Sequence, residues 1–394
     1  RRRPDAQARS PGPFPQSPQV RRCAVPDPWG LARKKYPAPV LKRQVLGLKM
    51  LCLCGEDDHM SDNPPPAWVY NQTVKMFAAG AEPPFEDTGE LEAHWGRAWG
   101  VGNDVGRIRS VLVHRPGAEM NVIDQNQRIE AIGSFGNVDE GWYFQSDTVP
   151  DIAEMQTQHD ALVSALKAED IEVHEVAGVA GNRLKSCYTR DPLIMVNGGA
   201  IVCRMGARIR RGEELAITRT LAGLGIPILR TLNGTALMEG GSFAWLNEAT
   251  AVIGCGVRVN REGASQIGEV LARQGVELLV IDLVGYDIHI DGSLLMIDKD
   301  LALINPFGLP YSFLQELQAR GIRTIEITPG DDDWIVNSLA VAPGRLVMPE
   351  GASNHTLDQL AKHGISWSVI PYDKMQLNGG GIHCSTMPLT RDPV

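Results

Sequence analysis

Cys384 is the residue best suited to covalent chemistry, because three consecutive glycines lead into it in the segment Gly379-Gly380-Gly381-Ile382-His383-Cys384. Glycines let the backbone turn tightly and approach a ligand with no Cβ in the way. A free cysteine in such a place is either a nucleophile or a small buried core residue. Both interpretations stay open on this segment alone.

A histidine and a carboxylate lie close together in a second segment, Tyr286-Asp287-Ile288-His289-Ile290-Asp291-Gly292. If this segment is extended, the side chains of His289 and Asp291 point to the same face, because side chains alternate along a strand. A histidine that stood alone would more often be a structural residue satisfied by a neighbour. With the carboxylate beside it, we expect both groups to face one pocket.

Two further segments carry acidic residues in a suggestive context. Thr189-Arg190-Asp191 precedes a proline, and Glu239 precedes Gly240-Gly241. Taken singly, Arg190 with Asp191 could be a surface ion pair, and Glu239 with its glycines could be a turn. The order of all four segments along one chain is the stronger signal.

In that order the segments resemble the motifs of the guanidino-group modifying superfamily, which contains arginine deiminases, dimethylarginine dimethylaminohydrolases and amidinotransferases. The resemblance covers residues 108–394. It implies that Cys384 is the nucleophile, that His289 is the general acid and base, and that Asp191 and Asp291 bind the guanidinium nitrogens. Glu239 matches the acidic residue that closes on the substrate nitrogens or orients the histidine.

The chemistry of a guanidinium group requires these residue types. Its carbon is a poor electrophile because resonance spreads the charge, so a strong nucleophile and a rigid grip on the cation are both needed. A thiolate supplies the first and two carboxylates the second. The cationic substrate, or His289 when protonated, would lower the pKa of Cys384. We expect hydrolysis of a guanidino or amidino C–N bond through a covalent thiouronium intermediate, with no metal and no organic cofactor.

The motifs also depart from those of individual members. Ser242 stands where the hydrolases generally have Asp, and Leu377-Asn378 stands where the deiminases have an arginine that grips the substrate carboxylate. These departures put free arginine in question as the substrate. Arg208 and Arg258 resemble positions that bind a substrate carboxylate, although both could equally be surface arginines paired with nearby glutamates.

Two other functions remain open. The Gly-Gly-Gly-Ile-His-Cys segment also resembles the amidinotransferase version of the cysteine loop, in which an amine takes the amidino group. The compact body, with no long insertion before Glu239, favours a hydrolase. A silent relative that only binds a guanidino ligand is the second alternative, but it would have no use for a thiolate at the end of a glycine loop.

The elements that must position these residues alternate from about Arg107 onward. Short apolar runs predict strands at 110–114, 171–176, 200–204, 227–229, 251–255, 277–282, 293–297, 301–304, 324–327, 345–348 and 366–370. Amphipathic patterns predict helices at 152–169, 213–224, 263–274, 312–320 and 356–363, with Asp151 and Ser312 as N-caps. This alternation is typical of an α/β protein built from repeated units. The resemblance implies a pentein-type α/β propeller of about five pseudo-symmetric αββαβ units around a central channel.

Composition divides the 394 residues unevenly. Residues 1–59 hold 12 of the 38 Lys and Arg but 5 of the 47 Asp and Glu, and 9 of the 26 Pro. We interpret 1–59 as a disordered or non-native extension, 60–106 as a lead-in and 107–394 as one catalytic domain. The acidic remainder argues against a nucleic-acid partner and favours a small cationic substrate.

Several classes are disfavoured by what the sequence lacks. There is no Gly-x-Gly-x-x-Gly opening a helix after a strand, no Walker A sequence, no Cys-x-x-Cys pair in the body and no apolar run of membrane-spanning length. We therefore expect a cytoplasmic enzyme with a guanidino or amidino substrate and no membrane partner. A homo-oligomer is compatible with the sequence.

Overall fold

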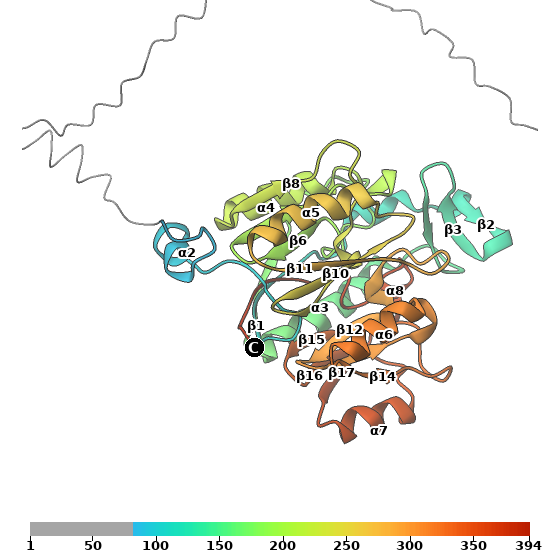
Figure 1. The fold of residues 1–394 in the computed structure, drawn as a ribbon. Coiled ribbons are helices and arrows are strands. Elements are labelled where there is room, and N and C mark those ends of the chain that lie inside the picture. The colour runs from blue at the N-terminus through green and yellow to red at the C-terminus, as the bar shows by residue number, and fades with distance from the viewer. Residues whose placement is uncertain (1–81) are drawn as a thin grey trace, which may run out of the picture. The chain divides into compact units, whose positions relative to one another are not determined.

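The structure, a computed structural model, describes residues 82–394 (Figure 1). The predictions for residues 1–59 and for the first part of the 60–106 segment lie outside these described residues. The described part of the chain falls within one compact unit, Gly80–Val394. None of its helices has both the length and the apolar character needed to cross a membrane.

Five three-stranded sheets make up the body. They are β18 (Met387–Arg391), β1 (Ile108–Val113) and β5 (Glu172–Glu175); β6 (Leu193–Val196), β7 (Gly199–Val202) and β8 (Ile228–Thr231); β9 (Phe243–Asn247), β10 (Thr250–Cys255) and β11 (Glu277–Asp282); β12 (Leu294–Asp298), β13 (Leu301–Ile304) and β14 (Arg323–Glu326); and β15 (Leu339–Ala342), β16 (Arg345–Pro349) and β17 (Ser366–Ile370).

All five sheets have the same internal order. The middle strand pairs antiparallel with the first strand named above and parallel with the third. A helix connects the middle strand to its parallel partner, as a parallel pair requires. These helices are α3 (Ile152–Ala168), α4 (Glu213–Leu224), α5 (Arg261–Arg273), α6 (Tyr311–Ala319) and α7 (Asn354–Lys362). The fold is therefore mixed α/β with one unit repeated five times.

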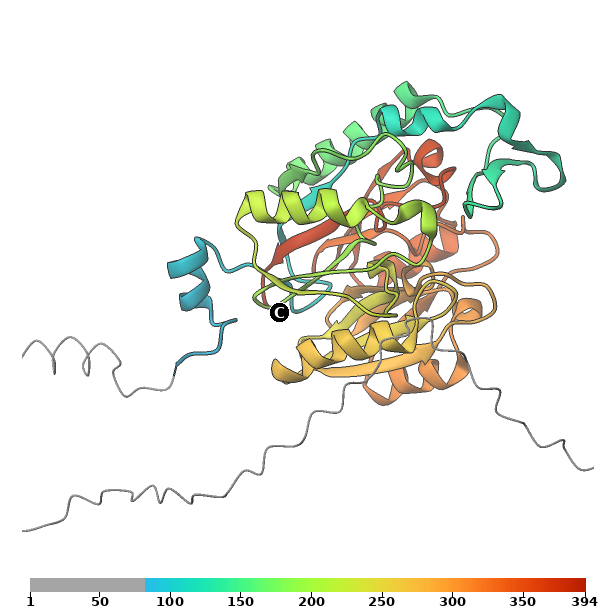
Figure 2. The ribbon, with the colours of Figure 1, turned by 90° about the horizontal axis from the view of Figure 1, so that it is seen from above.

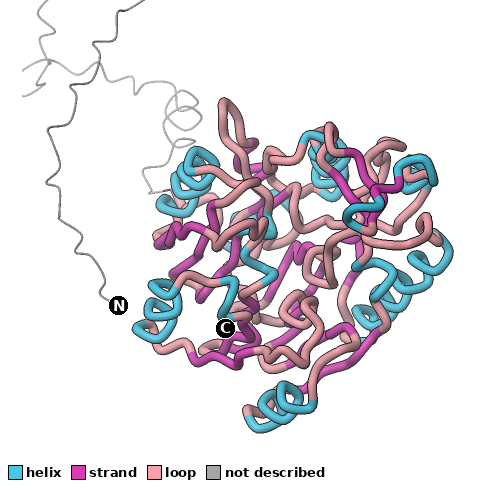
Figure 3. Tube along the Cα trace, turned by 90° about the vertical axis from the view of Figure 1, so that its right-hand side faces the viewer, coloured by secondary structure: helices cyan, strands magenta, loops and turns pink. Residues whose placement is uncertain are grey.

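The helices lie outside the strands (Figures 2 and 3). In α3, Met155, Leu162 and Leu166 are buried at the spacing of one helix face, and the Asp151 side chain accepts the Glu154 N–H as predicted for an N-cap. The middle strands are almost entirely buried because helices cover one face and neighbouring sheets the other. Burial on both faces explains their continuous apolar runs.

All five predicted helices and all eleven predicted strands are present, with ends shifted by up to two residues. The predicted cap Ser312 is wrong: α6 begins at Tyr311, and its N-cap Pro310 has no side-chain hydrogen bond to offer. The sequence pattern did not identify α2 (Thr88–Trp95), α8 (Asp373–Gln376) or the small sheet of β2 (Arg128–Ile129), β3 (Ser134–Asn137) and β4 (Trp142–Phe144).

Four other missed strands have a common position. β6, β9, β15 and β18 are the antiparallel outer members of their sheets, each four or five residues long. Three of them begin directly after a segment that the sequence analysis singled out for chemistry. Strands of this length are too short to show a strand pattern in the sequence, and glycines, prolines or polar residues precede them.

Candidate active site

Each repeated unit presents the residues just before its antiparallel strand to one region of the molecule. Asp191 lies two residues before β6, and Glu239 lies in the segment that leads through a short 3₁₀ turn into β9. His289 and Asp291 precede β12, Asn337 precedes β15 and Cys384 precedes β18. The repeat therefore brings together side chains that are far apart in the sequence.

Cys384 is buried, with 5% of its surface exposed. Its Sγ donates to Asp291 Oδ2 across 3.4 Å, and its backbone N–H donates to Asn337 Oδ1 at 3.1 Å. Burial, followed by the charges of Asp291 and Asp191, raises the pKa of the Cys384 thiol well above its ordinary value. In the ligand-free protein the thiol form is favoured.

Asp291 links the cysteine to a second histidine. Its Oδ2 lies 2.9 Å from His383 Nδ1. Burial alone would raise the pKa of Asp291, but the hydrogen bond from His383 and nearby positive charge lower it. Burial and the charge of Arg190 lower the pKa of His383, so at neutral pH this histidine is a neutral donor to the carboxylate.

His289 lies between two carboxylates. Its Nε2 is 2.8 Å from Glu239 Oε2, and its Nδ1 is 3.5 Å from Asp191 Oδ1. Burial by itself would lower the pKa of His289, but Asp191 and then Glu239 outweigh it and raise the pKa. The imidazolium form is thereby favoured near neutral pH.

The expectation that His289 and Asp291 lie on one strand is wrong. His289 is extended, but Ile290–Gly292 form a 3₁₀ turn, so the two side chains contact different partners. Both nevertheless line the same cavity as Cys384. The two side chains thus reach one cavity because the chain bends at the 3₁₀ turn, and not because side chains alternate along a strand.

Glu239 is fully buried and makes several contacts. Its Oε1 accepts the Gly206 and Ala207 backbone N–H groups at 2.9 and 3.3 Å, and Arg258 Nη1 donates to its Oε2 at 3.1 Å. Burial would raise the pKa of Glu239, but the hydrogen bond and charge of His289 and the charge of Arg258 lower it. Arg258 therefore reaches the site through Glu239, and the alternative of a merely superficial ion pair does not hold.

The structure does not bring Arg208 into this cluster. Arg208 is exposed at the start of a 3₁₀ turn and lines neither of the two cavities beside Cys384. Arg210, two residues further on, is buried instead and binds both Asp191 and Glu213. The 3₁₀ turn thus buries Arg210 against the two carboxylates and leaves Arg208 at the surface.

Three more buried residues at the site were not predicted. Asn337 holds the Cys384 backbone and also donates through Nδ2 to the Asp291 carbonyl oxygen at 3.2 Å. Lys185 Nζ donates to the Tyr143 carbonyl oxygen at 2.7 Å and to Asn378 Oδ1 at 2.9 Å. His383 was visible only as part of the glycine segment. The repeated architecture is the feature that could have identified Asn337. Asn337 lies just before the antiparallel strand of its unit, as Asp191 and Glu239 do in theirs.

The glycines of these segments are required by close packing. A Cβ on Gly241 would lie 2.7 Å from His289 Nδ1 and 2.8 Å from Asp191 Oδ1. A Cβ on Gly381 would lie 2.6 Å from Asn337 Oδ1. Real Cβ contacts are not this short, so the glycines allow the backbone to approach the polar groups of the site.

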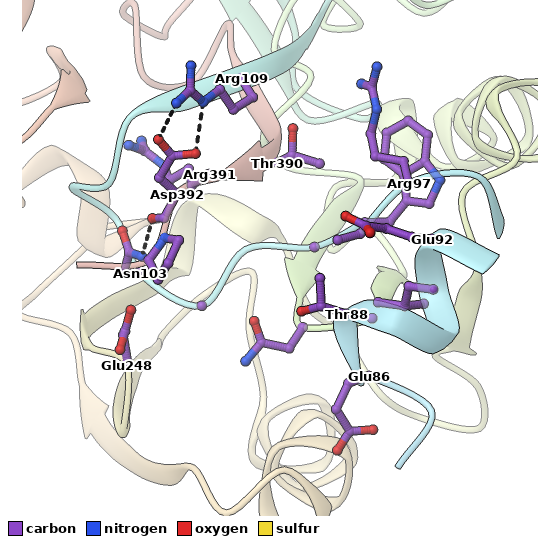
Figure 4. Close-up of a pocket in the computed structure, with 18 of the residues that line it drawn as sticks. Glu86, Thr88, Glu92, Arg97, Asn103, Arg109, Glu248, Thr390, Arg391 and Asp392 are labelled. Carbon is purple, nitrogen blue, oxygen red and sulfur yellow. Dashed lines mark hydrogen bonds and ion pairs between the residues drawn. The ribbon is translucent and has the colours of Figure 1, made fainter. Parts of the chain in front are cut away.

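Two cavities meet at Cys384 and His289. One is a narrow space of about 20 Å³ whose lining includes Lys185, Arg210 and Arg258. The other, of about 420 Å³, is open and is lined by Asp287, Asp291 and Asp333 among others. A third cavity, of about 820 Å³ beside α2, contains none of the predicted site residues (Figure 4). Two of its arginines are paired with acids, Arg97 with Glu172 and Arg109 with Asp392.

Asp191, Glu239 and His289 also offer three ligand atoms within 4.8 Å of one another, a spacing that a metal ion could use. The guanidinium groups of Arg210 and Arg258 are bonded to the two carboxylates. Those positive neighbours would oppose a further cation. Within the described residues, the cluster holds the His289 ring between two carboxylates.

The structure therefore combines a buried cysteine beside a carboxylate, a histidine held between two carboxylates and five repeated α/β units, as the resemblance to the guanidino-group modifying superfamily leads us to expect. The family profile described as "N,N dimethylarginine dimethylhydrolase, eukaryotic" matches residues 144–391. The chain belongs to this family. It is an enzyme of the class that hydrolyses C–N bonds in linear amidines, and amidinotransferases are among its relatives.

Three relatives illustrate this range. The N(G),N(G)-dimethylarginine dimethylaminohydrolase of Pseudomonas aeruginosa is 24% identical over 239 residues, 60% of this chain and 89% of its own. The arginine deiminase of Oenococcus oeni is 25% identical over 253 residues, 52% of this chain and 61% of its own. An amidinotransferase of saxitoxin biosynthesis from Microseira wollei, 14% identical, has a TM-score of 0.60 over 75% of this chain and 98% of its own.

The solved structure of the Pseudomonas enzyme, a cysteine-to-serine mutant complexed with citrulline, has a TM-score of 0.57 and 19% identity over 71% of this chain and 99% of its own. At this identity the comparison establishes the fold and not the details of the site. The mixed α/β fold expected from the sequence is confirmed.

Proposed function

We propose that the protein hydrolyses a guanidino or amidino C–N bond through a covalent adduct on Cys384, and gives a ureido product and ammonia or an amine. One observation carries this proposal most strongly: Cys384 Sγ lies against Asp291 in the same cavity wall as His289. A carboxylate there would hold the guanidinium cation against the sulfur, and an imidazolium is at hand to protonate the leaving nitrogen.

Binding of the substrate creates the nucleophile. In the empty site the carboxylates of Asp291 and Asp191 oppose a thiolate. A bound guanidinium neutralises their charge, so the pKa of Cys384 falls and the thiol loses its proton to solvent water. The enzyme would thus form its reactive thiolate only when the target is present.

In the first half-reaction the Cys384 thiolate forms an S–C bond to the guanidino carbon, and a C–N bond then breaks. The leaving nitrogen keeps the electron pair of that bond and receives a proton from the His289 imidazolium, which becomes neutral. Asp191 and Glu239 hold the ring in place for this transfer. The product of the step is a thiouronium cation on Cys384.

In the second half-reaction a water molecule attacks the thiouronium carbon. One proton of the water goes to neutral His289 and the other to the released amine, and the C–S bond breaks to return the electron pair to sulfur. The ureido product leaves, and the thiolate and imidazolium are restored.

We also propose that the five units close around a central channel. This closure would place the five segments that precede the antiparallel strands at one mouth of the channel.

The test is a substrate screen with the full chain. Arginine, methylated arginines, agmatine, guanidinoacetate and 4-guanidinobutyrate are incubated with the wild type and with Cys384→Ser, and ureido and amine products are followed by mass spectrometry. A ureido product that requires Cys384 supports the proposal. Product formed equally by Cys384→Ser would contradict it.

The second candidate function is amidino transfer. The Gly-Gly-Gly-Ile-His-Cys loop and the similarity to the Microseira amidinotransferase favour it. In that case an amine replaces water in the second half-reaction. Parallel incubations with and without glycine or ornithine distinguish the two, because a transferase forms its product only when an amine acceptor is present.

A further inference from the structure

The two cavities beside Cys384 differ in charge. The narrow one has Lys185, Arg210 and Arg258 in its wall and a volume of about 20 Å³, which is room for about one water molecule. The open one measures about 420 Å³, within the usual range for small-molecule pockets, and no Lys or Arg of the described residues lines it. The free space at the nucleophile therefore lies on the acidic side, which we call the acidic compartment.

Asp287 is the carboxylate best placed to receive a ligand there. It is half-buried at the wall of the acidic compartment, and its side chain has no hydrogen-bond or ion-pair partner among residues 82–394. Burial raises its pKa, and no neighbouring cation within the described residues offsets this effect. A half-buried carboxylate without a partner is costly unless a ligand supplies one.

Ser293 lies beside Asp287 and is also without a partner. It is 5% exposed and lines the compartment, yet no hydrogen bond involves its hydroxyl among the described residues. A Cβ on Gly308 would lie 2.0 Å from Ser293 Oγ and 3.0 Å from Asp287 Oδ2, so both groups meet above this glycine. A hydroxyl and a carboxylate that meet at one point, neither of them bonded to another described residue, can bind an N–H donor that carries positive charge.

Asp333 extends the negative charge to the rim of the compartment, where its side chain is exposed. The wall of one cavity thus includes Cys384 and the carboxylates of Asp291, Asp287 and Asp333. A ligand with a guanidinium at one end and an ammonium at the other would meet a carboxylate at each.

We propose that the acidic compartment binds an alkylammonium group, either at the far end of the guanidino substrate or on a separate amine acceptor. The inference rests on the proposed function for the position of the guanidinium, and it adds the chemical class of what lies beside it.

The test compares two guanidines of similar length and opposite tail charge, agmatine and 4-guanidinobutyrate. We expect the wild type to have the higher kcat/KM for agmatine. Asp287→Asn should lower that kcat/KM by roughly 10- to 100-fold, the usual effect of losing one hydrogen bond to a charged group. The same substitution should leave the value for 4-guanidinobutyrate unchanged or raised. Asp358→Asn, on the exposed face of α7, is the matched control and should change neither.

A second arm locates the source of the ammonium group. If product forms only with an added amine and Asp287→Asn raises the KM for that amine, the group belongs to the acceptor. If agmatine turns over without an acceptor and is sensitive to Asp287→Asn, the group belongs to the substrate. Both results support the inference.

A binding measurement separates this inference from the proposed function. In the Cys384→Ser background, agmatine and butylamine are titrated by calorimetry with and without Asp287→Asn. Weaker binding in the Asp287 variant supports the acidic compartment even if the wild type shows no turnover. The inference is overturned if Asp287→Asn changes neither the affinities measured in the Cys384→Ser background nor the ratio of the kcat/KM values for agmatine and 4-guanidinobutyrate in the active enzyme. The hydrolase proposal would then be judged by its own substrate screen.

Discussion

Asn337 Oδ1 accepts the backbone N–H of Cys384 at 3.1 Å, and this bond connects the fifth repeated unit to the nucleophile. Asn337 is 1% exposed and also holds the Asp291 carbonyl oxygen and the His383 backbone N–H. It is a positioning residue, because its bonds fix the backbone at Cys384 and Asp291, and its side chain also partly offsets the burial that raises the pKa of the neighbouring Cys384 thiol. Its loss should shift the sulfur relative to Asp291.

Asn337→Ala should therefore lower kcat by roughly 100-fold while KM changes little, because a displacement of about 1 Å at a nucleophile has this effect. The measurement is steady-state kinetics on any substrate found in the screen. Asn354→Ala, at the exposed start of α7, is the control and should leave kcat intact. The alkylation rate of Cys384 distinguishes displacement of the thiol from unfolding. An unfolded variant would expose Cys384 and be alkylated faster than the wild type, whereas a folded variant with a displaced thiol would stay protected.

The raised pKa of Cys384 predicts slow alkylation in the absence of substrate. At neutral pH the buried thiol is mostly protonated, so iodoacetamide should modify it more slowly than a free model thiol, and the rate should rise as pH passes above 9. Peptide mass spectrometry resolves Cys384 from the other cysteines. Rapid modification at pH 7 without ligand would contradict the idea that substrate forms the thiolate.

Glu239→Gln should move the pH dependence of catalysis. The carboxylate raises the pKa of His289, and burial alone would lower it. Since the imidazolium is the proposed acid, activity is lost as pH rises through this pKa, and removing the negative charge should shift that alkaline limb of kcat/KM to lower pH. A profile that keeps its alkaline limb in place would show that Glu239 does not set the protonation of His289.

The same raised pKa has a consequence for stability. A histidine whose pKa is higher in the folded than in the unfolded protein stabilises the fold below its unfolded pKa and loses this contribution as pH rises through the folded pKa. His289→Gln should therefore flatten the pH dependence of the unfolding midpoint above about pH 6.5, the ordinary pKa of a histidine, because the wild type loses this contribution as pH rises through the higher folded pKa. Thermal unfolding at fixed ionic strength measures it, and an unchanged slope would count against a charged His289.

Gly241→Ala should abolish activity with a smaller effect on folding. The added methyl group would be placed 2.7 Å from His289 Nδ1, which forces the histidine away from Asp191. We expect a loss of activity of more than roughly 100-fold. Gly223→Ala in α4 is the contrasting control: nothing lies within 4 Å of its Cβ, so helix propensity should stabilise the protein by about 0.5–1 kcal/mol. Activity retained by Gly241→Ala would contradict the geometry described.

Residue types in a characteristic order single out Cys384, His289, Asp191 and Glu239 in the sequence, and the structure brings these four side chains together. Their chemical roles stay predictions. The 3₁₀ turn at Ile290–Gly292 and the choice of Arg210 over Arg208 could not be predicted, because they depend on contacts between units that are far apart in the sequence.

The same reason explains the missed strands and Asn337. A four-residue strand is set by its partner strand and not by its own pattern. Asn337 carries no recognisable motif, and only the five-fold repetition of the sheets reveals that its position is equivalent to those of Asp191 and Glu239.

The most direct test of the account is to trap the covalent adduct. The full chain is mixed with a substrate found in the screen, quenched with acid during turnover, digested and analysed by peptide mass spectrometry. The account predicts an amidino group on Cys384 that appears before product, decays with turnover and is absent from Cys384→Ser. Ureido product formed with no adduct on Cys384 at any time, or an adduct on another residue, would contradict it.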